Sequence, residues 1–388
     1  TPYDHGTYGS RTTPTMGPQL RKAAASLKAA LADMAAQQWN VARQAVTVKN
    51  GQVIHSASGK TISFGALTKG KKILLPVNGQ VQLTPAVKWS VAGTPVPKVN
   101  AKSFVSGKHK YVSDMAMPGM VYGKILRAPT YGASLAGADI EKAKRAPGVT
   151  VVKEDDFIGV TAPDPQTAAN ALAKIEARWK TTPQPSRAEI FTYLKTHSRK
   201  EKNQEGDAGK AVKDAFREAP VQAQQHFEVQ YIAHVPLEPR AALAVWENGK
   251  LTVWTGTQRP FGVQEELAEA FSISKNNIRV MMPDTGSAYG GKHSGEAAVE
   301  AARLAKAVGK PVKVVWTREE EFKWAYFRPG GLIEAAAGAS SEGLLTSWEF
   351  HNYNSGGAGI EVPYEVPHRH IQYHPSDTPL KQGSYRGL

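Results

Sequence analysis

The chain has 388 residues, a formal net charge of +14 and no cysteine. This length is enough for two or three domains with hydrophobic cores. The lack of cysteine excludes disulfides, thiolate zinc sites, cysteine-ligated iron–sulfur clusters and a cysteine nucleophile.

The apolar runs of the sequence are short and interrupted, which predicts no transmembrane segment. Residues 1–4 do not form a signal peptide, and any targeting segment is absent from this chain. The localisation is therefore unknown, because cytoplasm and periplasm both suit a cysteine-free protein.

The basic excess is confined to one region. Residues 1–130 contain 17 Lys and Arg but only 3 Asp and Glu, whereas the remaining 31 basic residues are matched by 31 acidic ones. Such an excess suits nucleic acid, an anionic membrane surface, a phosphate-bearing cofactor or an acidic partner, and equally a solvated lysine surface. Aromatic residues are sparse there, so we disfavour nucleic acid as a partner.

The first 100 residues predict a small unit. Residues 1–16 are rich in Gly, Ser, Thr and Pro and predict a loop. The apolar spacing over 18–36 predicts a helix, and 39–54 predict a β-hairpin with its turn at Asn50-Gly51. Residues 76–100 predict an extended connector.

A second unit is expected over 101–205. Its elements alternate: strand 121–127, helix 140–146, strand 149–152, helix 167–174 and strand 175–179. The charged, glycine-containing stretch 197–213 predicts a linker.

A third unit is expected over 218–388. It begins with a half-buried strand over 221–231 and a hairpin made of 241–246 and 251–255. A helix over 261–271, a strand over 278–282, a helix over 296–308 that ends at Gly309, and a strand over 312–317 follow. The fold class is therefore α+β, with helices and strands mixed throughout.

A glycine-rich turn, Asp284–His293, lies between the strand at 278–282 and the helix at 296–308. Such a turn lets backbone N–H groups approach an anion, and Lys292 would add a full charge. The turn is neither a Walker A loop nor a dinucleotide fingerprint. A purely structural turn remains the alternative, with Asp284 bracing the loop.

Gln258 lies where the preceding strand ends, a position at which α/β-type sites gather. A plain helix N-terminus capped by Thr257 is the alternative. His368, His370 and His374 alternate as metal ligands on a strand do, but flanking prolines and the lack of nearby acidic residues favour a surface strand. Glu319–Glu321 predict an acidic first helical turn, and Glu154–Asp156 predict a solvated loop.

Five segments stand out in order along the chain. They are Thr7–Pro14, Met117–Pro129 with Pro147-Gly148-Val149, His234–Arg240, Thr257–Phe261 with Gly286–Lys292, and Leu380–Gly387. Together these segments resemble the large, molybdenum-cofactor-binding subunit of the xanthine dehydrogenase/aldehyde oxidase family of hydroxylases, in its branch similar to the isoquinoline 1-oxidoreductase β-subunit. The resemblance covers nearly the whole chain.

The resemblance implies three domains: a partial cofactor-binding domain with a connector (1–100), an a/b hammerhead-like domain (101–205) and a second, truncated molybdopterin-binding domain (218–388). It also implies that the chain is a fragment that lacks the family's catalytic glutamate and is inactive by itself.

The resemblance also assigns catalytic roles. Gln258 matches the glutamine that hydrogen-bonds an oxygen ligand on molybdenum. Tyr289 and Gly290 match the Phe-Gly pair beside the metal. His293 stands where some xanthine-oxidising members have a substrate-orienting glutamate, which argues against a purine bound in the same way.

The remaining implied contacts are to the cofactor. They are assigned to Gly9, Ser10, Arg11, Gly291 and Arg386, in addition to Gln258, Tyr289 and Gly290. No protein side chain is expected to bind the molybdenum, because the dithiolene of the pterin holds it.

The implied enzyme is a molybdenum-dependent oxidoreductase that hydroxylates an aldehyde or an N-heteroaromatic carbon with water. Its cofactor would be molybdopterin cytosine dinucleotide. Its partners would be an iron–sulfur subunit that takes the electrons and the missing remainder of the large subunit. A cofactor-free assembly protein of the same fold is the alternative, and a basic nucleic-acid-binding protein is the less favoured one.

Overall fold

The computed structural model describes residues 4–199 and 207–386. Their contacts divide the chain into two compact units. The small unit is Ser10–His109, and the large unit runs from Lys110 onward and also includes the residues up to Gly9. Among the described helices, none is both long and apolar enough to cross a membrane.

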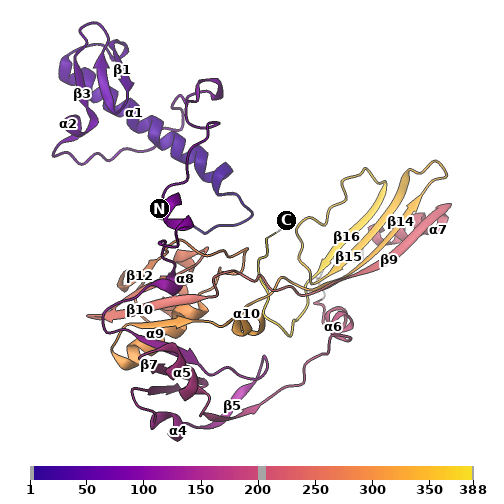
Figure 1. Ribbon diagram of the computed structural model, residues 1–388. Helices are drawn as coiled ribbons and strands as arrows, with labels where there is room; N and C mark the ends of the chain where they lie inside the picture. Colours follow the sequence, from indigo (N-terminus) through magenta and orange to yellow (C-terminus); the bar gives the residue numbers. More distant parts are fainter. Residues whose placement is uncertain (1–3, 200–206, 387–388) are drawn as a thin grey trace. The chain divides into compact units, whose positions relative to one another are not determined.

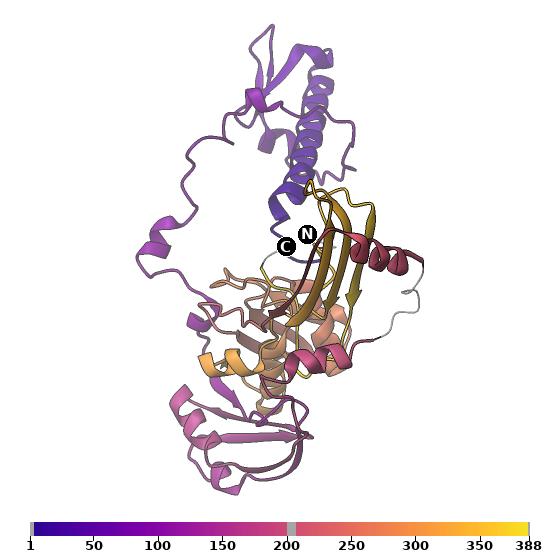
Figure 2. The ribbon, with the colours of Figure 1, turned by 90° about the vertical axis from the view of Figure 1, so that its right-hand side faces the viewer.

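The small unit packs a long helix against a three-stranded sheet (Figure 2). Leu31, Ala32 and Ala35 of the helix are buried against Val46 and Val53 of the hairpin. Its elements are α1 (Gly17–Trp39), β1 (Val46–Lys49), β2 (Gln52–His55), β3 (Thr61–Ser63), α2 (Phe64–Thr68) and α3 (Ala101–Val105).

The predicted hairpin and helix of the small unit are confirmed. Asn50 and Gly51 both have positive φ, as a two-residue hairpin turn of this hand requires. The predicted N-terminal loop is wrong in its last part, because Thr12–Met16 form a π-helical turn that continues into α1.

The large unit is built around a seven-stranded mixed sheet in the order β12-β11-β10-β13-β4-β7-β6 (Figure 1). The predicted hairpin of β10 and β11 is confirmed, and β11 pairs in parallel with β12. The strands are β4 (Val121–Ile125), β6 (Thr150–Glu154), β7 (Phe157–Ala162), β10 (Ala241–Glu247), β11 (Lys250–Thr255), β12 (Ile278–Met281) and β13 (Val312–Val315).

Helix α9 (Glu296–Val308) packs closely on this sheet and ends at Gly309, as predicted. The close approach depends on small residues. A Cβ at Gly123 would lie 2.5 Å from Leu304 Cδ1, and one at Gly159 would lie 2.8 Å from Leu304 Cδ2. Both distances are below any real Cβ contact, so β4 and β7 need glycine beneath Leu304.

Shorter elements complete this part of the large unit. They are β5 (Ser134–Asp139), which pairs with β8 (Glu176–Lys180), and the helices α4 (Glu141–Lys144), α5 (Pro165–Leu172), α8 (Pro260–Phe271) and α10 (Arg318–Trp324). The predicted acidic first turn is confirmed in α10, where Thr317 and Glu320 form a reciprocal capping box.

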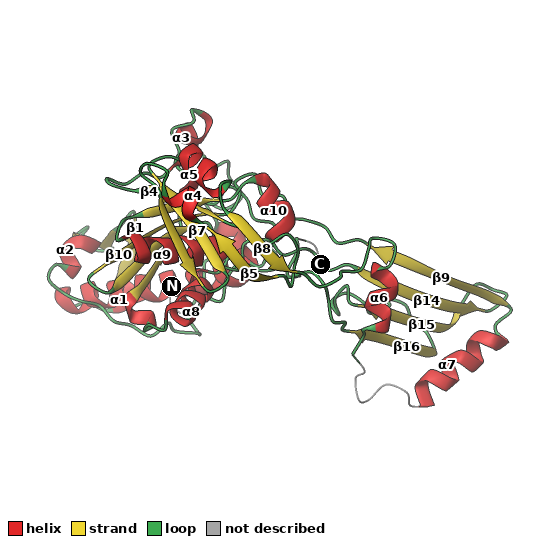
Figure 3. Ribbon diagram, turned by 90° about the horizontal axis from the view of Figure 1, so that it is seen from below, coloured by secondary structure: helices red, strands yellow, loops and turns green. Residues whose placement is uncertain are grey.

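A second sheet, of four strands, has the order β16-β15-β14-β9 (Figure 3). Its strands are β9 (Val221–Val229), β14 (Gly331–Ala339), β15 (Leu345–Tyr353) and β16 (His368–His374), and the helices beside it are α6 (Ile190–Thr196) and α7 (Asp207–Glu218). Strand β16 confirms that His368–His374 form a strand.

Two predictions in this region are wrong. The expected linker over 197–213 contains the start of α7, whose Val212 is buried. Residues 200–206 of that prediction lie outside the described residues. Strand β9 is exposed rather than half-buried. It is an edge strand, and α7 packs on β14, β15 and β16 instead.

We expect Gly123→Ala to lower the free energy of unfolding of the large unit by about 1–3 kcal/mol, because the new methyl group overpacks the sheet against Leu304. Urea unfolding followed by circular dichroism measures this loss. The control is Gly65→Ala in α2, where nothing lies within 4 Å of the new Cβ. Equal stability of Gly123→Ala and wild type would contradict the packing argument.

Candidate functional site

Five loops of the large unit meet near the carboxyl ends of β11 and β12. They are residues 4–9, 234–240, 255–259, 284–293 and 383–386, and each carries contacts to at least one other. Because β11 and β12 are parallel neighbours, the loops that follow them leave the same edge of the sheet. The strand pairing therefore brings Gln258 and the glycine-rich turn together.

Gln258 and Gly290 are at the centre of this arrangement. The Gly290 N–H donates to Gln258 Oε1 at 2.9 Å, and Gln258 Nε2 donates to the Thr7 carbonyl at 3.1 Å. The backbone of Gln258 is fixed independently of its side chain. Its N–H donates to the Lys292 carbonyl at 2.8 Å, and its carbonyl accepts from the Thr7 N–H at 2.8 Å.

The glycine-rich turn has an unusual backbone. Ser287, Tyr289 and Gly290 all have positive φ, at 74°, 58° and 91°. The left-handed region is costly for residues other than glycine, so Ser287 and Tyr289 must be held by their surroundings. Tyr289, which precedes Gly290, is 38% exposed.

Two glycines of the turn let other loops approach its backbone. A Cβ at Gly290 would lie 2.9 Å from the Ser384 carbonyl oxygen, and one at Gly291 would lie 2.6 Å from His234 Cγ. His234 Nε2 in turn lies 2.6 Å from the same Ser384 carbonyl. The loops 234–240 and 383–386 are thus packed directly against the glycine-rich turn.

His293 lies at the end of the turn with its ring mostly buried. Its Nε2 is 3.0 Å from the Thr7 carbonyl, and its ring centroid is 4.3 Å from that of Tyr8. The backbone N–H of His293 donates to the Tyr326 hydroxyl at 3.1 Å, and that hydroxyl donates to the Gly290 carbonyl. Burial raises the pKa of Tyr326 to about 12, so the hydroxyl stays protonated.

A buried charge network supports the turn from beneath. Arg240, only 4% exposed, donates from Nη1 to Glu321 Oε2 at 2.6 Å and from Nη2 to the Gly291 carbonyl. Its Nε lies 3.3 Å from Glu296 Oε2, at the start of α9. Glu238 accepts the Gly286 N–H at 2.9 Å. One guanidinium thus joins the turn to α9 and α10.

Lys292 does not supply charge to an anion site, which corrects the expectation from the sequence. It is 1% exposed, and its Nζ donates to the Glu238 carbonyl at 2.7 Å and lies 3.6 Å from Glu238 Oε2. Burial lowers its pKa. The lysine therefore binds Glu238 inside the protein and is not available to a ligand.

The remaining sequence-derived residues lie on the surface. Gly9 ends the N-terminal loop of the large unit, while Ser10 and Arg11 belong to the small unit, and all three are exposed. Arg386 is also exposed, and Gly387 of the same motif lies outside the described residues.

Sequence reasoning missed the supporting residues Arg240, Glu321 and Tyr326. Arg240 was within a recognised motif, but no signal in the sequence links it to Glu321, which lies 81 residues away. The hydroxyl of Tyr326 is likewise brought to the turn only by the folding of the loop after α10.

Comparison with known proteins identifies the family. Residues 194–376 and 1–115 each match a family described as molybdopterin cofactor-binding domain, and together they cover well over half of the chain. The chain belongs to the xanthine dehydrogenase family of molybdenum hydroxylases. The family resemblance seen in the sequence is therefore confirmed.

Two curated relatives in this family align over most of the chain. A nicotinate dehydrogenase subunit of Pseudomonas putida is 28% identical over 92% of this chain and 31% of its own length. The isoquinoline 1-oxidoreductase β-subunit of Brevundimonas diminuta is 25% identical over 83% of this chain and 47% of its own length. The chain thus spans about a third of the length of the first relative and just under half of the length of the second.

Solved structures of molybdenum hydroxylases share the fold. Quinoline 2-oxidoreductase from Pseudomonas putida 86 superposes with a TM-score of 0.63, at 20% identity, over 76% of this chain and 46% of that chain. CO dehydrogenase from Oligotropha carboxidovorans has a TM-score of 0.63 at 21% identity, over 75% and 45%. The mixed α and β fold class is therefore confirmed.

The buried ion pair beneath the turn generates a stability prediction. We expect Glu321→Gln to lower the free energy of unfolding by about 3–5 kcal/mol, because it leaves the Arg240 charge buried with a weakened partner. The matched control on the same helix is Glu319→Gln, whose pair with Lys323 is exposed to solvent and therefore contributes little to stability. Chemical unfolding compares the two, and equal losses would contradict the assigned role of Arg240.

The buried histidines generate a pH prediction. Burial lowers the pKa of both His293 and His234 below the usual 6.5. As the pH falls through about 6.5, the unfolded chain therefore takes up protons that the folded chain does not, and the free energy of unfolding falls. We expect His293→Gln to lose less stability than wild type between pH 7.5 and pH 5.5 in urea titrations; parallel losses would contradict this.

Proposed function

We propose that this chain forms part of the cofactor-binding large subunit of an enzyme that hydroxylates an aldehyde or an N-heteroaromatic carbon with oxygen from water. The names of its relatives support this substrate class: nicotinate dehydrogenase, isoquinoline 1-oxidoreductase and the aldehyde oxidoreductase molybdenum-binding subunit of Escherichia coli. The observation that carries the proposal is the contact between the Gln258 amide and the Gly290 N–H.

These residues fit a molybdopterin cofactor by their chemistry. The cofactor, when bound, supplies the redox-active molybdenum, and the protein then needs neutral donors placed beside it. The Gly290 N–H and Gln258 Nε2 are such donors, and Gln258 Oε1 accepts from the Gly290 N–H at 2.9 Å. Both residues lie in loops that follow a pair of parallel strands. A Cβ at Gly290 would also close the approach of the 383–386 loop.

The Gln258 side chain is the part of the Gln258–Gly290 pair that can move. Its side chain holds both Gly290 and Thr7, while its backbone is anchored by separate hydrogen bonds to Lys292 and Thr7. Rotation of the side chain alone therefore releases the Gly290 N–H and presents the Gln258 amide to a bound cofactor. The strained turn stays in place, because Tyr326 and Arg240 hold the carbonyls of Gly290 and Gly291.

The remaining roles are proposed from the family resemblance. Tyr289 would face the substrate beside Gly290, and the buried ring of His293 would orient it. The exposed guanidinium groups of Arg11 and Arg386, with Gly9, Ser10 and Gly291, would contact the pterin and its phosphates. The cytosine dinucleotide is the proposed form of the cofactor.

The electrons would leave through iron–sulfur clusters on another polypeptide. This chain has no cysteine to bind such clusters. The two curated relatives compared above are each named as one subunit of an enzyme. An iron–sulfur subunit is therefore the proposed partner.

A tagged version of this chain, purified with its native partners, tests the proposal. We expect the complex to contain molybdenum and pterin and to reduce a dye with nicotinate, isoquinoline or an aldehyde as donor. Gln258→Ala should lower kcat/KM at least tenfold, a loss of about 1.4 kcal/mol of transition-state stabilisation, with the iron content unchanged.

The control is Gln166→Ala, which removes an exposed amide that donates to Asn170 of its own helix. Its kcat/KM should equal that of the wild type. A complex without molybdenum and pterin would overturn the proposed function, whereas full activity of Gln258→Ala in a loaded complex would overturn only the role of Gln258.

A further inference from the structure

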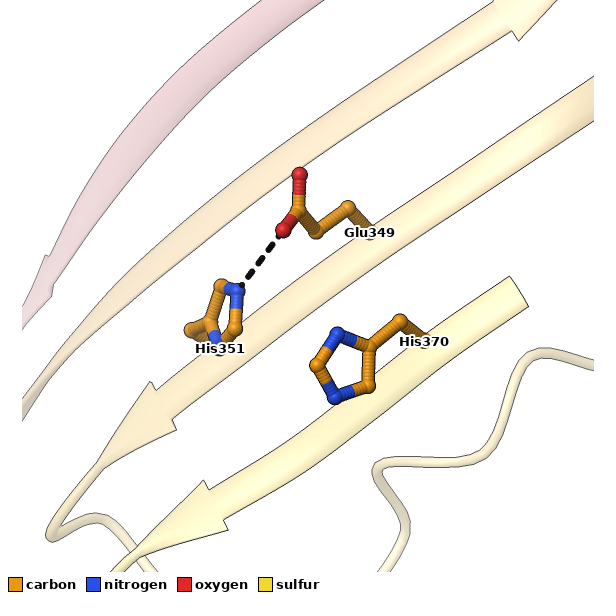
Figure 4. Close-up of side chains that lie close together, drawn as sticks. All are labelled: Glu349, His351 and His370. Carbon is orange, nitrogen blue, oxygen red and sulfur yellow. Dashed lines mark hydrogen bonds and ion pairs between the residues drawn. The ribbon is translucent and has the colours of Figure 1, made fainter. Parts of the chain in front are cut away.

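Three potential metal ligands lie on one face of the four-stranded sheet (Figure 4), whereas Gln258 and Gly290 lie in loops that follow strands of the seven-stranded sheet. Strands β15 and β16 are parallel, and their register pairs Glu349 with His370 and His351 with Gln372. Side chains of alternate residues share a face of a sheet. Glu349, His351 and His370 therefore project to the same side by strand geometry.

The three side chains are close enough to act together. One ligand atom from each lies within 4.8 Å of the others, and His351 Nε2 is 3.1 Å from Glu349 Oε1. The His351 and His370 rings are nearly perpendicular, with centroids 5.4 Å apart. Zinc ligands lie about 2.0–2.2 Å from the ion, so small side-chain rotations would bring these atoms onto one ion.

His374 orients His351 from the other side. His351 Nδ1 lies 3.0 Å from His374 Nε2, so one of these nitrogens donates to the other. His351 Nε2 faces Glu349 in either case. When Nδ1 carries the proton and donates to His374, Nε2 has a lone pair that can bind a metal ion. A metal-binding imidazole commonly donates its second N–H in this way, which fixes the ring and its tautomer.

The groove around these residues admits an ion and a further ligand. It has a volume of about 1490 Å³ and is open to solvent, and Glu349 and His351 are 19% and 21% exposed. Its lining contains five basic side chains, which are Lys195, Arg199, Lys210, Lys213 and Arg217. Three of them form ion pairs: Lys195 with Glu334 at 2.5 Å, Arg199 with Asp377 at 2.6 Å, and Arg217 with Asp214. These ion pairs weaken the repulsion that a cation would meet.

We propose that Glu349, His351 and His370 form a binding site for a divalent transition-metal ion of the zinc class, with a coordination position open to the groove. Two imidazoles and one carboxylate suit Zn²⁺, Ni²⁺ or Cu²⁺, whereas Ca²⁺ and Mg²⁺ prefer oxygen ligands. The site rests on the four-stranded sheet alone and does not depend on the proposed function.

Calorimetric titration of the metal-free full chain with Zn²⁺ at pH 7.5 tests the site. We expect saturable binding of one ion per chain. Glu349→Gln, His351→Gln and His370→Gln should each lower the affinity at least tenfold. Circular dichroism checks that each variant is folded. The absence of saturable binding by the wild type would overturn the proposal.

The matched control is His368→Gln, the same substitution in the same strand two residues before His370, where the side chain is exposed. It should bind Zn²⁺ as the wild type does, and an equal loss there would overturn the ligand assignment. Co²⁺ gives an independent readout. Its visible absorption should appear with the wild type and disappear with His351→Gln, whereas its persistence in that variant would exclude His351 as a ligand.

His374→Gln separates orientation from ligation. We expect its Zn²⁺ affinity to fall by about 10- to 100-fold, the usual effect of losing a residue that orients a metal-binding histidine. The Co²⁺ absorption should be retained at saturating metal. Unchanged affinity would overturn the orienting role of His374.

Discussion

The buried guanidinium of Arg240 is the interaction on which the candidate site depends. It interacts with Glu321 of α10, Glu296 of α9 and the carbonyl of Gly291. Two helices and the glycine-rich turn therefore all contact the same positive charge. Charges in such a dry environment attract each other strongly, but each is costly if left without a partner. The turn therefore cannot move without exposing or unpairing this network.

That rigidity explains how the strained turn persists. Tyr289 and Ser287 have left-handed backbones, which cost of order 1–3 kcal/mol each. The neighbouring carbonyls of Gly290 and Gly291 are held by the Tyr326 hydroxyl and Arg240. The fixed backbone leaves the Gln258 side chain as the part of the central pair that can exchange hydrogen-bond partners.

The large unit has two different sets of polar residues, in two different places. The charged side chains of Arg240 and Glu321 support the glycine-rich turn, whereas the hydrogen bond between Gln258 and Gly290 joins neutral groups. Imidazoles and a carboxylate gather instead on the four-stranded sheet, where parallel register brings Glu349 and His351 beside His370. One pattern suits a cofactor that carries its own metal, and the other suits a metal ion bound by side chains.

The sequence by itself determined the local features: the Asn50-Gly51 turn, the β10–β11 hairpin, the end of α9 at Gly309 and the acidic first turn of α10. Each of these features depends on residues that are neighbours in the sequence. Their conformational preferences appear as short sequence patterns, so the features can be predicted. Only the tertiary structure decided the burial of Lys292, the exposure of β9 and the approach of Glu349 and His351 to His370. Each of these depends on which strands become neighbours and which helices cover them. The pairing of segments that are distant in the sequence cannot be predicted from short local patterns.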